Sequence, residues 1–254
     1  MNAIKLITDG YRKIFSGPNA LLKNISLFAL TGLLTAISLY FESFKAVKNL
    51  PTDINFSAFF AASAGLIILA VYIGGYTYKF MHKAFFETEE ELLPDFNLEP
   101  IGLFLKALPL IIVWLIYLII MIGIVTVGMA ISMFIGIVLG ILFLCMATFL
   151  SFIFVAYCEN FNAKGLFNII LPFKFIAPTI GMVAILGILF IPVGILSMVP
   201  SVLAGLILGI IGYADTNIPA YVGGLLGGYF GLLAQFVWYY CLVQVYKERL
   251  RPMM

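Results

Sequence analysis

The amino-acid sequence predicts an all-α membrane protein, a polytopic helical bundle. Of its 254 residues, 63% are apolar and only 10% are charged, and the mean hydropathy is +1.14. Soluble domains contain about 45–50% apolar and about 25% charged residues, so this composition is that of a chain that lives in a bilayer. Stretches of about 20 apolar residues, enough for a helix to cross a hydrocarbon core of about 30 Å, recur along the chain.

Six such stretches predict six spans, arranged as three consecutive hairpins in one integral membrane domain, residues 1–254. The spans lie near residues 24–41, 58–78, 107–127, 131–157, 179–199 and 222–243. A lysine stands at the start of each odd-numbered span, in "ALLKNISLF", "LFLKALPLI" and "LPFKFIAPTI". Each even-numbered span ends in a matching way, with Tyr78-Lys79, Tyr157-Cys158-Glu159 and Tyr246-Lys247, an aromatic residue at the level of the lipid headgroups followed by charge. These matching ends indicate a repeat of hairpins.

The segment before the first span, "MNAIKLITDGYRKIFSG", predicts an amphipathic helix in the membrane interface. Its apolar residues, from Ile4 to Phe15, follow helical spacing, while basic residues occupy the other side. Gly17 and Pro18 are expected to end this helix.

The basic residues predict that both termini face the cytoplasm. With six spans, twelve of the fourteen fall on one side: Lys5, Arg12, Lys13, Lys23, Lys79, Lys83, Lys106, Lys164, Lys174, Lys247, Arg249 and Arg251. Lys45 and Lys48 fall on the other. Because cytoplasmic loops carry the excess of lysine and arginine, the larger group is assigned to the cytoplasm.

Residues 200–221 are apolar but are not predicted to form a seventh span. Their uninterrupted part, residues 201–212, would cover about 18 Å as a helix, which is too short for the hydrocarbon core. A seventh span would also move the basic C-terminus outside. We expect a re-entrant or interfacial element on the outer side.

The loop at residues 86–100, "FETEEELLPDFNLEP", is the first candidate site. It holds six of the twelve acidic residues of the chain and is predicted to be cytoplasmic. The candidates for docking a basic cytoplasmic or membrane partner are Glu87, Glu89, Glu90, Glu91 and Asp95. A solvated linker is the alternative. In either case Leu92, Leu93, Phe96 and Leu98 are expected to anchor the second half of the loop at the membrane.

The last span opens with "YVGGLLGGYFG", whose glycines are spaced for close helix contact. The candidates are Gly223, Gly224, Gly227, Gly228 and Gly231. Glycines four residues apart let two backbones approach closely, which favours van der Waals packing in a membrane. The contact is expected within the chain, with a homo-oligomer interface as the alternative.

Catalytic and metal-binding patterns are scarce, and the sequence predicts no enzyme, no cofactor and no metal. The single histidine, His82, has no second histidine or cysteine pair to complete a metal site. The cysteines have no CxxC spacing and are expected to be reduced. A net charge of +2 gives no basic field for nucleic acid. Gln235, the most polar mid-span residue, is expected to pack or to line a narrow path.

Several short motifs resemble a known family. They are "YIGGYTYKF" at the end of the second span, "ELLPDF" in the acidic loop, the Gly-Leu-Phe entry to the third span, and "AYCENFNAKGLFN" after the fourth. In this order they resemble the prokaryotic membrane-protein family called domain of unknown function 4013. The resemblance implies a multi-pass protein of a prokaryotic cell membrane and implies no particular activity.

Two functions therefore stay open from the sequence. The first is a non-enzymatic bundle that organises or assists other membrane components, with membrane lipids and other proteins as partners. The alternative is a transporter or permease subunit for a small solute or lipid, which Pro192 in the fifth span and the glycine-rich sixth span would favour. An intramembrane enzyme is the weakest hypothesis, because no nucleophile and base are evident.

Overall fold

The computed structural model describes residues 2–17, 19–45, 56–86, 92–96, 100–161, 166, 171–213 and 216–253. The described elements are all helices, which confirms the all-α prediction. They are α1 (Ala3–Phe15), α2 (Ala20–Lys45), α3 (Phe56–Phe86), α4 (Pro100–Ile131), α5 (Met133–Asn160), α6 (Leu171–Leu208) and α7 (Ile218–Val245). A π-helical turn, Gly209–Tyr213, extends α6, and two short turns, Tyr246–Leu250 and Arg251–Met253, extend α7.

Five of these helical segments are long and apolar enough to cross a membrane. They are Ala20–Phe41, Phe59–Phe86, Leu105–Ile131, Lys174–Tyr213 and Ile218–Leu250. Each covers one predicted span, in one case from the second residue of that span, and is longer than predicted. The remaining predicted span, 131–157, lies in α5, a continuous helix of 28 residues whose apolar stretch among the described residues is Met133–Leu142. The chain is a multi-pass helical membrane protein by helix length and hydropathy.

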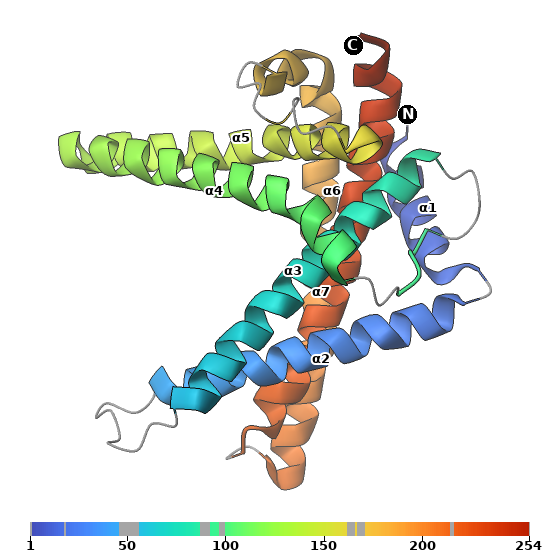
Figure 1. Ribbon diagram of the computed structural model, residues 1–254, viewed down its shortest axis with the longest axis vertical. Helices are drawn as coiled ribbons and strands as arrows, with labels where there is room; N and C mark the ends of the chain where they lie inside the picture. The colour runs from blue at the N-terminus through green and yellow to red at the C-terminus, as the bar shows by residue number, and fades with distance from the viewer. Residues whose placement is uncertain are drawn as a thin grey trace.

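Helix α4 packs along α5, and α6 along α7, while α2 contacts both α3, the next helix in the chain, and, more extensively, α7. Figure 1 shows that the hairpins leave a shared junction in different directions, with α4 and α5 projecting to one side of the α6–α7 pair. Helix α1 packs against α7 near the chain end, so the two termini lie close together at this junction.

The apolar core lies at the junction, where one end of each hairpin meets the others. Phe80 of α3 and Phe236 of α7 are fully buried, and their rings stack with centroids 4.8 Å apart. Phe152 of α5 is fully buried as well and packs edge-on against Phe175 of α6. Aromatic pairs of this kind stabilise beyond the apolar area that they bury, so four helices are fixed at one point.

Residues 200–213 continue α6 and do not begin a new helix. The re-entrant or interfacial position of residues 200–221 at the membrane stays a prediction. Helix α6 continues through Pro192 and Pro200 to Leu208, and the π-helical turn carries it to Tyr213. A proline removes one backbone hydrogen bond, but packing against a neighbour can hold the helix together. Here the Ser201 hydroxyl donates to the Gly223 carbonyl of α7 over 2.7 Å. The helical path ends where Gly212 takes a φ of 95°, which favours glycine.

Helix α1 begins and packs as its amphipathic pattern predicts. The Asn2 side chain accepts from the backbone N–H groups of Ile4 and Lys5 and so caps the first turn. Its buried face contacts α7 at Gly10, where a Cβ atom would lie 3.0 Å from the side chain of Val237. The helix is therefore held by the protein as well as by any membrane surface.

Candidate functional site at the junction of the hairpins

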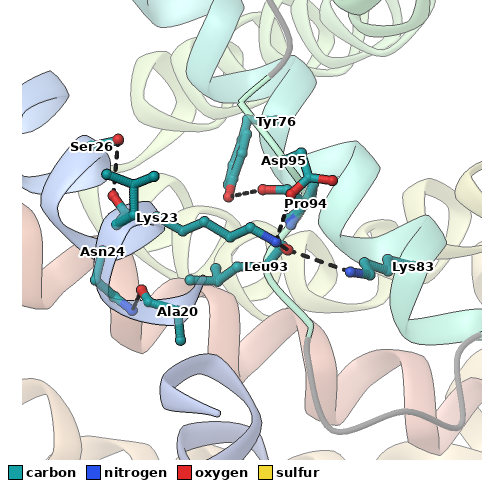
Figure 2. A network of polar contacts seen from close by, with 10 residues as sticks. Ala20, Lys23, Asn24, Ser26, Tyr76, Lys83, Leu93, Pro94 and Asp95 are labelled. Carbon is teal, nitrogen blue, oxygen red and sulfur yellow. Dashed lines mark hydrogen bonds and ion pairs between the residues drawn. The ribbon is translucent and has the colours of Figure 1, made fainter. Parts of the chain in front are cut away.

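A buried lysine forms the centre of a polar network at the start of α2 (Figure 2). The Lys23 side chain is only 5% exposed, and its Nζ lies 2.8 Å from Oδ1 of Asp95. The same Nζ donates to the Leu93 carbonyl over 2.9 Å, and Lys83 of α3 approaches that carbonyl at 3.5 Å. A charged group can be buried at low cost only when it is paired in this way.

Residues 92–96, here called the Leu-Pro clasp, connect three helices through backbone and side-chain contacts. Leu92 donates its backbone N–H to the Lys13 carbonyl at the end of α1 over 3.3 Å. The Tyr76 hydroxyl of α3 donates to the Pro94 carbonyl over 2.8 Å, and the ring of Phe96 stacks on Tyr76 with centroids 4.7 Å apart. The clasp thus joins α1, α2 and α3.

The apolar residues of the clasp were expected to anchor the loop at the membrane, and the structure corrects this expectation. Leu92 and Leu93 are 1% and 0% exposed, so they lie in the protein core and not at a membrane surface. Phe96 is packed on α3. Leu98 lies outside the described residues. The sequence pattern showed that these side chains would be anchored, but it could not show that the anchor is the protein itself.

Asp95 is the one acidic docking candidate that the structure describes. Its hydrogen bond from Lys23, together with the charges of Lys23, Lys83 and Lys79, lowers the pKa of its carboxyl below the usual value. The carboxylate is already engaged within the chain, which argues against Asp95 as a docking residue. The other candidates, Glu87, Glu89, Glu90 and Glu91, lie outside the described residues.

A second cluster surrounds His82 on α3. Its Nδ1 lies 2.7 Å from the carbonyl oxygen of Cys158 on α5, and its ring packs between Phe86 and Phe161. The ammonium of Lys106 lies 4.5 Å from the Phe161 ring centroid, a cation–π contact. The cluster joins α3, α4 and α5, which is the structural role expected for this histidine.

A third cluster fixes the C-terminal end of the chain. Glu159 at the end of α5 is only 11% exposed and pairs with Arg251 over 2.8 Å. The Tyr246 hydroxyl donates to the same carboxylate over 3.4 Å, and Lys247 donates to the Phe85 carbonyl over 3.0 Å. The end of α7 is therefore tied to both α3 and α5.

The contacts described for these clusters hold helices together. Among the described residues, no group of three or more His, Cys, Asp or Glu side chains could hold a metal ion. The thiols of Cys158 and Cys241 are free and buried. The described lysines and acids at the junction contact each other, backbone carbonyls or aromatic rings, which stabilises the junction.

The glycine-rich start of α7 lies between α2 and α6. A Cβ atom on Gly224 would come within 2.6 Å of Thr35, and one on Gly228 would lie 3.7 Å from Thr31, both on α2. A Cβ atom on Gly223 or Gly227 would lie 3.2 or 3.5 Å from the Ser201 hydroxyl of α6. A Cβ atom on Gly231 would meet no heavy atom within 4 Å. The first four glycines therefore pack against other helices of the same chain.

Gln235 does not lie inside the bundle. It is exposed on α7, and its Nε2 lies 3.5 Å from the Tyr239 hydroxyl of the same helix. The predicted path or internal packing contact is therefore not seen at this residue.

No protein-family model, curated protein or solved structure matches the chain. The resemblance to domain of unknown function 4013 stays a prediction. The sequence indicated Lys23 as a repeat marker and as one of the basic residues on the cytoplasmic side, but its pairing with Asp95 was missed. The available signal was the acid after Leu-Pro, since a lysine at the edge of an apolar span needs a partner.

Proposed function

We propose that this protein is a non-enzymatic membrane bundle that organises or assists other membrane components, with the α4–α5 hairpin as its docking arm. One observation carries the proposal. Of residues 114–142, only Gly128 and Gly136 are buried, so nearly the whole outer hairpin is an uncovered apolar surface. The base of α4 differs, because Ala107, Leu110 and Val113 are buried in the junction.

Close contact between the two helices of the arm supports this reading. A Cβ atom on Gly136 would lie 3.0 Å from the Met129 backbone, and one on Gly128 would lie 3.4 Å from Gly136. Such close backbone packing holds two membrane helices together without bulky side chains between them. The arm is then one preformed unit whose outward side chains, such as Ile119 and Ile124, are available to other helices.

Gln235 also favours protein partners. An amide exposed on the surface of a spanning helix is costly in hydrocarbon and is stabilised by hydrogen bonds across a helix interface. Its one described contact is long and lies within its own helix. A second copy of the chain or another membrane protein would supply better partners.

The proposed orientation places the junction, both termini and the acidic loop on the cytoplasmic side of a prokaryotic cell membrane. The described basic residues at the junction support it through the positive-inside rule. The residues of the acidic loop not engaged by Lys23 would then be available to a basic partner. Helix α6 passes Pro192 as one helix, so the broken helix that would favour the transporter alternative is absent at this position.

The test introduces a photoreactive amino acid at Ile119 or Ile124 of the arm in living cells. The control position is Ile188 of α6, which is also exposed and apolar. We expect discrete protein adducts from the arm and far fewer from Ile188. Lipid adducts alone at all three positions would contradict the proposal.

A further inference from the structure

A groove of about 320 Å³ lies where α1, α2 and α7 meet. Its walls are apolar side chains from the end of α1 and the first turns of α2, and its polar lining groups come from α2 and α7. The lining includes Phe15, Leu21, Ile25 and Phe28, with Asn24 and Tyr229. The volume is at the lower end of the range of about 300–1,000 Å³ that small-molecule sites occupy.

The polar groups that line the groove are satisfied by the protein. The Tyr229 hydroxyl donates to Oδ1 of Asn24 over 2.9 Å. Nδ2 of Asn24 donates to the carbonyls of Ala20 and Ile14 over 2.8 and 3.3 Å. Because these groups already have partners, the groove favours an apolar occupant over a polar solute.

The position of the groove indicates which apolar occupant is available. It lies along the first turns of the candidate span Ala20–Phe41. Leu21 is 76% exposed and Ile25 is 55% exposed, so water would contact them in a soluble protein, whereas in a bilayer lipid chains cover them. Behind them, Phe28 and Tyr229 meet edge to face and form a wall against which a chain can pack.

A cation precedes the groove on α1, one helical turn before the lining residue Phe15. Arg12 precedes Phe15 by three residues on α1, so the two side chains share one face of that helix. The Arg12 side chain is 72% exposed, and its contact with Asp9 is a surface pair at 3.6 Å that leaves other guanidinium donors available. Arginine is well suited to phosphate, because its planar donors match phosphate oxygens.

The neighbouring lysines point elsewhere. Lys13 lies over the Tyr240 ring on α7, and Lys23 lies against the Leu-Pro clasp. We propose that the groove binds one glycerophospholipid, with an acyl chain along α2 and Tyr229 and with the phosphate at Arg12. The lipid would seal the corner between the interfacial helix α1 and the first hairpin.

The first test locates the acyl chain in the unmodified protein. The full chain is placed in phosphatidylcholine nanodiscs that contain a small fraction of phosphatidylcholine with a diazirine in the upper half of one acyl chain, near the glycerol. We expect cross-links at Ile25, Phe28 and Tyr229 well above those at Leu33, a 54% exposed leucine on the same helix outside the groove. Equal labelling at all these positions would overturn the proposal.

The second test fills the groove. Ala20→Leu places a larger side chain in the groove lining, and Ala29→Leu makes the same change at an exposed position of α2 that does not line the groove. The first variant should reduce labelling of Tyr229 to the level of Leu33, and the second should leave it unchanged. Equal effects of the two variants would contradict a specific groove. Should Ala20→Leu fail to fold, the labelling pattern of the unmodified chain still decides.

The third test addresses the headgroup. Native mass spectrometry after mild detergent extraction would compare the phospholipid retained by Arg12→Gln with that retained by Lys5→Gln, a matched change at another exposed base of α1. A basic residue near a membrane surface contributes about 1 kcal/mol, so Arg12→Gln should lower retention about fivefold. The control should change little. Unchanged retention in Arg12→Gln would overturn the role of that residue.

Discussion

The substitution Asp95→Asn should loosen the Leu-Pro clasp. Lys23 is 5% exposed and would keep the Leu93 carbonyl, but its ammonium would lose the carboxylate that lies 2.8 Å away. Breaking a fully buried pair costs about 3–5 kcal/mol, and an exposed pair contributes about 0.2–1 kcal/mol. Because Asp95 is 74% exposed, water replaces part of the lost contact. We expect an intermediate cost of about 1–2 kcal/mol.

Hydrogen exchange at the clasp is the most direct assay. The Leu92 N–H bonds to the Lys13 carbonyl, so its exchange reports opening of the clasp from α1. A loss of about 1–2 kcal/mol corresponds to exchange roughly 5–30 times faster. Asp9→Asn removes the same kind of carboxylate from the surface pair with Arg12 and should change exchange at Leu92 little.

The effect should depend on pH with a defined sign. The pKa of the Asp95 carboxyl is lowered in the folded protein, so its contribution is present above the unfolded value of about 3.9 and is lost as the pH falls through the folded value. The difference between the unmodified chain and Asp95→Asn should be constant from about pH 5 to pH 8 and should shrink below about pH 4. Equal exchange in both proteins at neutral pH would refute the reasoning.

Two further predictions concern the packing of α7 and the C-terminal cluster. Gly224→Ala should destabilise the protein by about 1–3 kcal/mol, because its Cβ would meet the facing threonine of α2 at 2.6 Å. Gly231→Ala, which would meet no heavy atom, should be neutral or stabilising by up to about 1 kcal/mol in the same denaturant titration. Glu159→Gln should cost about 1–3 kcal/mol, because it removes the buried partner of Arg251, and proteolysis near the C-terminus should become faster. If proteolysis near the C-terminus were as slow in Glu159→Gln as in the unmodified chain, the stabilising role of the C-terminal cluster would be contradicted.

The sequence was sufficient to predict the membrane class, the helical hairpins and the amphipathic helix α1. Hydropathy is sufficient to predict the membrane-spanning helices, because each span must be apolar over a length set by the bilayer. The ends of the helices were harder to predict from the sequence. Residues 200–221 were expected to form an element apart from the fifth span, but the Ser201 hydroxyl donates to the Gly223 carbonyl of α7, and that contact involves a residue distant in sequence.

The candidate site was predicted only in part, for the same reason. The sequence indicated that Lys23 lies at a membrane boundary and that Asp95 belongs to an acidic loop. Nothing in local spacing joins two residues 72 positions apart in a single ion pair. The burial of Leu93 likewise depends on how three helices converge. Contacts between distant segments decide these features, and no local pattern in the sequence encodes them.

The central proposal is that the three helical hairpins meet at the cytoplasmic side of the membrane, where both termini and the acidic loop also lie. The most direct test is labelling of single cysteines with a membrane-impermeant maleimide in whole cells and in inverted vesicles, after replacement of the native cysteines. We expect Glu90→Cys and Glu248→Cys to react only in inverted vesicles and Asn217→Cys to react only in whole cells. Reaction of Glu90→Cys and Glu248→Cys from opposite sides would contradict the proposal.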